Sequence, residues 1–251
     1  MKLPISLVVV TLNEEKNIER CLKSAPWADE LLVLDSGSHD RTRELAEKMG
    51  AKVLNEPWRG YGAQKHRAVD LAKNDWVFAI DADEEISPEL SLEIQQFFSQ
   101  LQAEVAYSVP RKSFYLGRWI MHGGWYPDAQ TRLFQRHFSQ WNKKVIHERV
   151  VSPTVRSLKA PLYHYVFRNV EHHVATNNRY SSLQAEEYLK NGGRFSFFKF
   201  LFKPLSKFLE CYFLKLGFLD GRAGFVIAVG AAYSVFIRWA KIWQLSGEES
   251  S

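Results

Sequence analysis

The stretch Trp76-Val77-Phe78-Ala79-Ile80-Asp81-Ala82-Asp83 decides the fold that this sequence predicts. Its first five residues are apolar and include β-branched and aromatic side chains, which is typical of a short buried strand. Asp81 and Asp83 follow at a spacing that lets both carboxylates point into one cleft. In open α/β folds, ligands bind at the carboxyl ends of the strands. We therefore interpret this stretch as a sheet strand that ends at a ligand-binding cleft.

An Asp-x-Asp pair at the end of a strand suits a divalent cation. Mg²⁺ or Mn²⁺ takes a few oxygen ligands from the protein, keeps several waters and also coordinates the phosphates of a substrate. The alternative is an acidic turn that precedes the helix expected after Ser87-Pro88. The motif alone does not separate these two interpretations.

The first eighty residues alternate between apolar strands and amphipathic helices. The run 5–10 is almost continuously apolar, which is typical of a strand buried on both faces of a parallel sheet. Alternation of this kind predicts βαβ units and a parallel sheet. Besides 76–80, the expected elements are strands at 5–10, 31–34 and 52–54 and helices ending near Ser24, over 41–49 and after Gly60-Tyr61-Gly62.

Two of these strands end in side chains that suit nucleotide binding. Thr11, Asn13 and Glu14 follow the first strand, and Asp35 closes the second, where its carboxylate could accept a hydrogen bond from a nucleobase or a ribose. Each could equally be a cap or turn residue. The sequence has neither a Gly-x4-Gly-Lys motif nor a Gly-x-Gly-x-x-Gly motif after the first strand. This argues against P-loop and dinucleotide-binding proteins.

The composition is that of a folded protein in a reducing compartment. Of 251 residues, 46% are hydrophobic and 24% are charged, which suffices for one α/β domain with an appendage. Cys21 and Cys211 lie in unrelated contexts without metal-ligand spacing. The apolar run 5–12 is followed directly by Asn13-Glu14-Glu15 and no small-residue cleavage site, so we expect no signal peptide.

The C-terminal third predicts an amphipathic helix with a basic side. Seven basic and two acidic residues lie between Lys190 and Arg222, which accounts for the whole net charge of +5. From Phe195 to Tyr212 apolar residues recur at three- and four-residue steps and lysines at four-residue steps, with an interruption or kink expected at Pro204. Such a helix suits an anionic membrane surface. Nucleic acid is the competing partner, which we discount because no nucleic-acid motif accompanies the apolar stripe.

The uncharged run 224–237 follows this helix. Crossing a bilayer takes about 20 apolar residues, and this run is shorter. We expect an interfacial or re-entrant hairpin with the preceding helix, or a buried helix. The alternative for the whole C-terminal region is that its helices pack on the α/β core.

Three segments, taken in order, resemble the nucleotide-binding half of the family 2 glycosyltransferases. They are Val-Val-Thr-Leu-Asn-Glu-Glu (9–15), Leu-Asp-Ser-Gly-Ser-His-Asp-Arg-Thr (34–42) and Asp-Ala-Asp-Glu (81–84). The resemblance implies a GT-A fold, an α/β Rossmann-like and mostly parallel sheet flanked by helices, and inverting transfer from a nucleoside diphosphate sugar. Residues 123–128, 132–134 and 145–148 are similar to the branch that forms a β-1,4 link from glucose to the inner-core heptose of lipopolysaccharide.

The resemblance also implies roles for single residues. Asp83 would hold Mg²⁺ or Mn²⁺ on the diphosphate, and Asp81 would contact the ribose or the metal. A metal ion there would neutralise the charge that grows on the leaving diphosphate. Asp35 would accept a hydrogen bond from uracil. The expected nucleotide-sugar contacts are Thr11, Asn13, Glu14, Asp35 and Asp81, with Lys65 and Arg67 as phosphate or sugar contacts or else solvated helix charges.

Inversion by a single displacement needs one general base for the acceptor hydroxyl. Asp128 is the first candidate, because Gly123-Gly124 would let its loop approach the sugar closely and because it matches the place of the family's catalytic Asp. The family's usual Glu-Asp pair is Pro127-Asp128 here, and Glu148 is the alternative base. Arginines could bind the phosphates of a phosphorylated acceptor. The expected acceptor contacts are Trp125, Arg132, Arg136 and His147.

The sequence therefore predicts a glycosyltransferase domain over 1–185, with a nucleotide-sugar half at 1–105 and an acceptor half at 106–185, and a helical membrane-associating region at 186–251. We expect metal-dependent transfer of a hexose, glucose from UDP-glucose, to an inner-core heptose. The expected partners are a UDP-sugar donor, a lipid-linked saccharide acceptor and the anionic cytoplasmic face of a bacterial inner membrane, but no nucleic acid. The alternatives are transfer to a polyprenyl phosphate or a peptide, and a non-catalytic protein that binds UDP-sugar or membrane.

Overall fold

The computed structural model describes residues 2–142 and 148–248, and the chain divides into two compact units. Unit 1 comprises Met1–Arg111 and Asp128–His164, and unit 2 comprises Lys112–Pro127 and Tyr165–Ser251. The division predicted after residue 185 lies inside a helix of unit 2, α5 (Val170–Lys190). The assignment of residues 1–105 and 106–185 to donor and acceptor binding stays a prediction.

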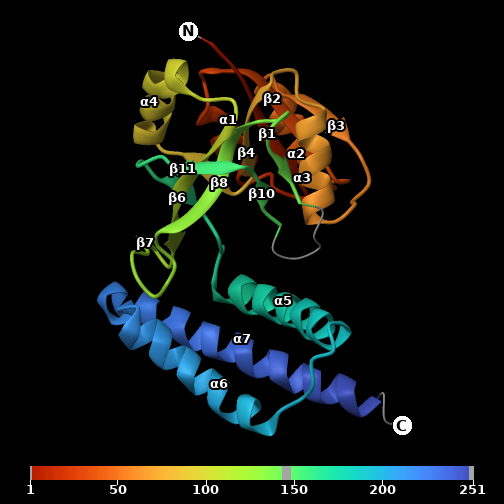
Figure 1. Cartoon of the computed structure of the whole chain (residues 1–251), viewed down its shortest axis with the longest axis vertical. Coiled ribbons are helices and arrows are strands. Elements are labelled where there is room, and N and C mark those ends of the chain that lie inside the picture. Colours follow the sequence, from red (N-terminus) through yellow and green to blue (C-terminus); the bar gives the residue numbers. More distant parts are fainter. Residues whose placement is uncertain (1, 143–147, 249–251) are drawn as a thin grey trace. The chain divides into compact units, whose positions relative to one another are not determined.

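Unit 1 is built on a mixed sheet with the strand order β3-β2-β1-β4-β8-β6-β12-β5 (Figure 1). The first four strands in the chain are parallel, as the alternating pattern predicts. They are β1 (Leu3–Thr11), β2 (Ala28–Asp35), β3 (Lys52–Asn55) and β4 (Trp76–Asp81), connected by α1 (Ile18–Lys23), α2 (Thr42–Lys48) and α3 (Tyr61–Asp70).

The second half of the sheet is largely antiparallel. β8 pairs antiparallel with both β4 and β6, β12 pairs antiparallel with β5, and β11 pairs parallel with β6. The Ser87 hydroxyl accepts a hydrogen bond from the Leu90 N–H and so caps α4. The elements of this half are β5 (Glu84–Ile86), α4 (Pro88–Phe97), β6 (Val105–Tyr115), β8 (Asp128–Gln135), β11 (Thr154–Ser157) and β12 (Leu162–His164). β9 (Gln140–Trp141) and β10 (Val150–Val151) form a separate two-stranded sheet, and β7 (Arg118–Trp119), in unit 2, pairs with the end of β6.

Both faces of β1 are buried, which explains why its sequence is almost continuously apolar, and the one polar residue within 5–10, Ser6, is hydrogen-bonded to Glu30. Ile5, Leu7 and Val9 belong to the core that α1 and α4 cover, whereas Val8 packs with the apolar residues of α3. Successive side chains of a strand point to opposite faces, so a strand covered on both sides needs apolar residues on both faces. The expectation for the run 5–10 is confirmed.

The strand register decides which polar side chains lie at the same edge of the sheet. Thr11 pairs with Asp35 and Val10 with Asp81, so β1, β2 and β4 end together. β8 runs the other way, with Gln135 opposite Trp76. Asp128, the first residue of β8, therefore lies at the edge where β4 ends.

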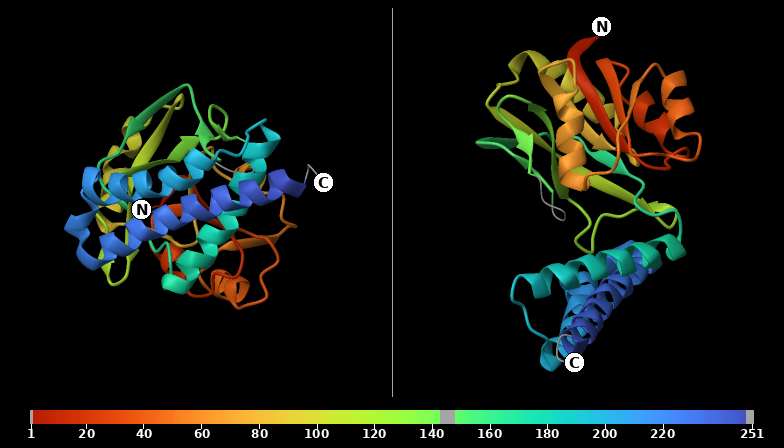
Figure 2. Two further views of the ribbon diagram at one scale, coloured as in Figure 1. Left: turned by 90° about the horizontal axis from the view of Figure 1, so that it is seen from below. Right: turned by 90° about the vertical axis from the view of Figure 1, so that its right-hand side faces the viewer.

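Unit 2 is helical. α7 (Gly221–Glu248) lies between α5 and α6 (Phe197–Leu209) (Figures 1 and 2). α6 is the predicted amphipathic helix, and it continues through Pro204 as one helix before a π-helical turn, Glu210–Leu214, and a 3₁₀ turn, Gly217–Asp220. With α7 it forms the expected helical hairpin. α7 extends beyond 224–237 at both ends, and it is long and apolar enough, by length and composition alone, to cross a membrane.

The turn between α6 and α7 is closed by a contact between two glycines. A Cβ atom on Gly224, in the first turn of α7, would lie 1.8 Å from the carbonyl oxygen of Gly217. The backbones of the turn and of α7 can approach this closely only because neither residue has a side chain.

Replacing Gly224 with alanine should destabilise unit 2 by about 1–3 kcal/mol, since the added methyl group must displace backbone atoms. Gly247→Ala is the matched control on the same helix, because a Cβ there meets no atom within 4 Å. That change should be neutral or stabilise by about 0.5–1 kcal/mol. Urea unfolding followed by circular dichroism measures both variants, and equal midpoints would contradict the close contact.

Candidate active site

The loop that follows β2 is organised by a buried carboxylate. Asp35 is fully buried and accepts hydrogen bonds from the backbone N–H groups of Gly37 (3.0 Å) and Ser38 (2.8 Å). Its other oxygen accepts from the hydroxyls of Thr11 (2.9 Å) and Ser38 (2.5 Å). These bonds join the loop after β2 to the end of β1. A direct contact between Asp35 and a nucleobase stays a prediction, and it requires a hydroxyl to leave the carboxylate.

The loop that follows β1 is held against the same segment. The Asn13 N–H donates to the Ser38 hydroxyl (2.8 Å), and the Glu14 N–H donates to the Thr42 hydroxyl (2.8 Å). Asn13 has a φ of 57°, in the left-handed region that asparagine tolerates better than most residues. The structure therefore gathers Thr11, Asn13, Glu14 and Asp35 in one pair of loops at the end of β1 and β2.

A series of oppositely charged side chains crosses the same edge of the sheet. Neighbours in this series lie between 2.5 and 3.2 Å apart. We call it the ion-pair network, and its members in order are Glu148, Lys65, Asp81, Arg132, Glu84, Arg111 and Asp128.

Glu84 and Arg132 form the buried centre of the ion-pair network. The Glu84 carboxylate is fully buried and accepts from Arg132 (2.5 Å), from Arg111 (3.2 Å) and from the backbone N–H of Asp81 (2.9 Å). Burial alone would lower the pKa of the Arg132 guanidinium, but the carboxylates of Glu84 and Asp81 outweigh this effect and raise it. Arg132 is 2% exposed and paired with Glu84 and Asp81, so its contact with acceptor phosphates stays a prediction that requires these partners to separate.

Asp81 has both carboxylate oxygens occupied. Oδ1 lies 2.7 Å from the Lys65 ammonium, and Oδ2 accepts from Arg132 at 2.9 Å. Burial raises the pKa of Asp81, but Lys65 and Arg132 together lower it well below its ordinary range. Asp81 is therefore ionised, and it can bind a metal ion only by giving up one of these partners.

Asp83 differs from Asp81 in its partners. The two side chains are about equally exposed (28% and 29%), but Asp83 faces the imidazole of His164, 3.4 Å away, whereas Asp81 contacts Lys65 and Arg132. Among residues 2–142 and 148–248, no cluster of three or more His, Cys, Asp or Glu residues could hold a metal ion. A cation beside Asp83 and His164 would thus take most of its ligands from water or a bound diphosphate, as Mg²⁺ commonly does.

The two candidate bases lie at opposite ends of the ion-pair network. Asp128 accepts from Arg111 Nε (2.9 Å) and from the Gln130 amide (2.7 Å). Burial raises the pKa of Asp128, but Arg111 outweighs this effect and holds it below its ordinary value. The Glu148 carboxylate lies 3.1 Å from the Lys65 ammonium.

Two other predicted contacts lie away from this network in unit 1. Arg67 pairs with Glu56, past the end of β3. Arg136 donates to the carbonyl of Ala72 (2.6 Å), beside the start of β4 and thus at the other end of β8 from Asp128, and its contact with the acceptor stays a prediction. Trp125 packs in unit 2, with ring centroids 5.7 Å from Tyr115 and 6.0 Å from Phe167. His147 lies outside the described residues.

Sequence reasoning missed Glu84, Arg111 and His164 as parts of the site. Arg111 reaches Asp128 because the two residues pair across β6 and β8, and His164 reaches Asp83 because His164 pairs with Glu84 across β12 and β5. Only the acidic run 81–84 hinted at Glu84, and no local pattern marks the other two.

A mostly parallel sheet flanked by helices, with an Asp-x-Asp at the end of β4, defines a glycosyltransferase of the GT-A fold. The chain belongs to Glycosyl transferase family 2, whose model matches residues 6–167. An uncharacterized glycosyltransferase of Rickettsia bellii is 34% identical over 96% of this chain and 87% of its own length. The lipopolysaccharide core biosynthesis glycosyltransferase LpsC of Rhizobium meliloti is 29% identical over 97% of this chain and 93% of its own length.

Among solved structures, the chain is similar to glucosyl-3-phosphoglycerate synthase from Mycobacterium tuberculosis in complex with Mn²⁺, uridine diphosphate and glucosyl-3-phosphoglycerate. That enzyme is 20% identical over 76% of this chain and 81% of its own, with a TM-score of 0.49.

The Asp128–Arg111 pair should make stability depend on pH in the acid range. The folded-state pKa of Asp128 lies below the ordinary 3.8, so the pair stabilises fully above that value and the effect is lost as pH falls through the folded pKa. The difference in unfolding free energy between wild type and Asp128→Asn should be constant from about pH 7 to about pH 5 and shrink below about pH 4. Urea titrations measure it, and a difference that grew on acidification would contradict the pairing.

Proposed function

We propose that the protein is a metal-dependent inverting glycosyltransferase that moves glucose from UDP-glucose to a heptose of the lipopolysaccharide inner core. The observation that carries this proposal is that one sheet edge holds the paired loops after β1 and β2, the partly exposed carboxylate of Asp83 and the ion-pair network ending in Asp128. Family membership supports glycosyl transfer. The similarity to LpsC, named for lipopolysaccharide core biosynthesis, supports the acceptor class.

In this proposal the paired loops bind the donor nucleotide. Thr11, Asn13 and Glu14 line the uridine site, and Asp35 keeps both loops in place or accepts from uracil once a hydroxyl leaves it. Asp81 faces the ribose, oriented by Lys65 and Arg132. Lys65 acts through Asp81 and not as a free phosphate ligand, because its ammonium already contacts Asp81 and Glu148.

Asp83 and His164 are the residues that we assign to the metal ion. They offer one carboxylate oxygen and one imidazole nitrogen, which fits Mn²⁺ well and leaves positions for the oxygens of a diphosphate. The bound ion would stabilise the negative charge of the leaving diphosphate. His164 replaces Asp81 in this role, because the oxygens of Asp81 are engaged by cations.

Asp128 is the proposed general base. The acceptor oxygen attacks the anomeric carbon, the bond from that carbon to the diphosphate breaks, and the hydroxyl proton passes to the Asp128 carboxylate. A single displacement of this kind inverts the anomeric configuration. Because Arg111 keeps the pKa of Asp128 low, the proton moves late, once the acceptor oxygen has begun to bond and has become acidic.

The proposal is tested by measuring UDP release from a panel of UDP-sugars with deep-truncated lipopolysaccharide, with and without a chelator. Release should depend on one donor, on the acceptor and on the metal. Asp83→Ala should abolish it and weaken metal-dependent UDP binding, whereas Asp75→Ala, at the opposite end of β4, should not. Turnover with polyprenyl phosphate or peptide instead would identify a related transferase, and UDP binding without any release would identify a binding protein.

Asp128→Asn should keep UDP affinity and lower the transfer rate by about 10²- to 10⁴-fold, the contribution of a general base. Glu148→Gln removes the carboxylate at the other end of the ion-pair network and should cost much less. Calorimetry with UDP and Mn²⁺, together with the UDP-release assay, separates binding from transfer. The reverse order of losses would make Glu148 the base.

We further propose that unit 2 binds an anionic membrane surface from the cytoplasmic side. α6 exposes large apolar side chains, among them Phe197 (68%) and Phe198 (69%), and the turn after it exposes Leu214 (80%). Lys199, Lys203 and Lys207 lie among these residues at four-residue intervals. Long lysine side chains can lie along apolar surface and keep their charge at the lipid headgroups.

The packing of α7 favours a peripheral position over a membrane crossing. The Lys241 ammonium, on α7, donates to the carbonyl and side-chain oxygens of Asn178 (both 2.7 Å) and to the Ser181 and Ser182 hydroxyls (both 2.8 Å). These acceptors belong to α5, a helix rich in charged residues. A bilayer crossing by α7 would carry α5 into the hydrocarbon layer, where charged side chains are costly.

Replacing Lys199, Lys203 and Lys207 together with glutamine should weaken binding to vesicles that contain phosphatidylglycerol by about a hundredfold, at about 1 kcal/mol for each lysine. Neutral phosphatidylcholine vesicles should show little difference. The control changes Lys23, Lys48 and Lys52 of unit 1, which alters the net charge equally. Co-sedimentation measures both, and equal losses would place the membrane-binding charge elsewhere.

A further inference from the structure

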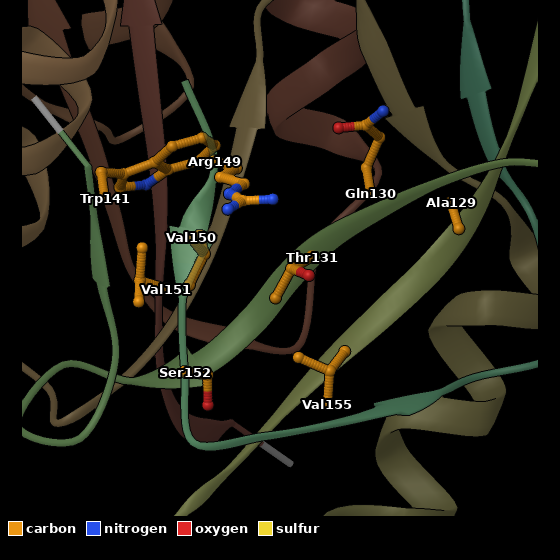
Figure 3. A pocket seen from close by; sticks show the side chains of 9 residues that line it. All are labelled: Ala129, Gln130, Thr131, Trp141, Arg149, Val150, Val151, Ser152 and Val155. Carbon is orange, nitrogen blue, oxygen red and sulfur yellow. The ribbon is translucent and has the colours of Figure 1, made fainter. Parts of the chain in front are cut away.

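A cavity of about 380 Å³ lies beside β8 in unit 1 (Figure 3). Its walls come from four consecutive strands, with Thr131 on β8, Trp141 on β9, Val150 on β10 and Val155 on β11. The volume is within the range of about 300–1,000 Å³ that is usual for small-molecule sites. Among the described residues, those that line it do not include Trp125, Arg132 or Arg136, which were predicted to bind the acceptor.

Arg149 is the charged residue of this cavity. Its backbone N–H donates to Asn142, but its guanidinium has no hydrogen bond or ion pair with any residue that the structure describes. Figure 3 shows the guanidinium extending from the β10 side of the cavity toward the β8 side, where Thr131 lies. Arg111 and Arg132, in contrast, are fully engaged in the ion-pair network. A free guanidinium presents a planar set of donors that matches a phosphate or a carboxylate.

The other walls suit a saccharide. Trp141 is only 5% exposed, and its indole N–H has no partner within the described part of the chain. Because this N–H is out of reach of solvent, Trp141 contributes apolar ring surface to the wall rather than a donor. The Thr131 hydroxyl adds a polar group, and the valines offer an apolar surface to the C–H groups of a sugar ring.

The cavity adjoins the proposed base through a single side chain. Gln130 lines the cavity, and its amide donates to Asp128 Oδ1 at 2.7 Å. A ligand in this cavity would therefore be separated from the reacting carboxylate by one residue.

We propose that this cavity binds the acceptor saccharide and that Arg149 recognises an oxyanion, a phosphate or a carboxylate, on that saccharide. This rests on the proposed glycosyltransferase function and adds that the acceptor is anionic. It also replaces Arg132 and Arg136, which the structure places elsewhere, with a residue whose guanidinium is free.

The test uses the oligosaccharide released by mild acid from deep-truncated lipopolysaccharide, in three forms: native, treated with phosphatase, and both phosphatase-treated and carboxyl-reduced. Binding to the full-length protein is measured by calorimetry, with and without UDP and Mn²⁺. Arg149→Ala should weaken binding of the native form by about ten- to a hundredfold, the range for a hydrogen bond to a charged group. It should not weaken binding of the uncharged form.

Arg156→Ala is the matched control, because Arg156 is an exposed arginine on β11 next to Val155 and does not line the cavity. It should bind every form as wild type does. If phosphatase alone removes the effect of Arg149→Ala, the oxyanion is a phosphate, and if carboxyl reduction is also needed, it is a carboxylate. An equal loss on all three forms, or no loss on any, would overturn the proposal.

The same protein samples separate this proposal from the proposed function. Arg149-dependent binding without UDP release from any donor would keep the anion site and reject the transferase. Acceptor-dependent UDP release with an unchanged acceptor KM in Arg149→Ala would keep the transferase and reject the site.

Discussion

The buried contact between Glu84 and its two arginines is the interaction on which the active-site edge depends. Removing one partner of a buried ion pair leaves an uncompensated charge and costs about 3–5 kcal/mol, so Glu84, Arg111 and Arg132 must stay together. The backbone N–H of Asp81 donates to the same carboxylate, which ties the end of β4 to this centre. Arg132 also contacts Asp81, and Arg111 also contacts Asp128. The positions of these two aspartates therefore depend on the same three charged residues.

This arrangement divides the charged residues of the edge into two classes. Those in the ion-pair network are occupied, and their purpose in our proposal is to orient Asp81 and Asp128. Asp83 with His164, and the guanidinium of Arg149, lie outside this network and are the groups that we assign to ligands. The ion-pair network thus stabilises the fold and, in our proposal, also determines which charged groups can bind the diphosphate and the acceptor.

Unit 2 likewise combines a charged group that is fully paired with side chains that are left exposed. The ammonium of Lys241 is saturated by oxygens of α5. α6 packs on α7 through contacts such as Phe200 with Phe236 but leaves other apolar side chains exposed, among them Phe197 and Phe198. A helix hairpin fixed on one side and exposed on the other is suited to lie on a membrane rather than across it. A lipid-linked acceptor would be met at that surface.

The sequence by itself determined the parallel half of the sheet, because a strand covered on both faces must be almost continuously apolar, as 5–10 is. It also determined the Asp-x-Asp at a strand end and the amphipathic period of α6. Only the tertiary structure determined which arginines are buried and which groups they pair with. Arg132 and Arg136 are four residues apart, yet one is buried against Glu84 and the other lies beside the start of β4, because antiparallel pairing with β4 carries β8 from one edge of the sheet to the other. Which charge is buried, paired or free depends on contacts between residues far apart in the chain, and no local pattern encodes those.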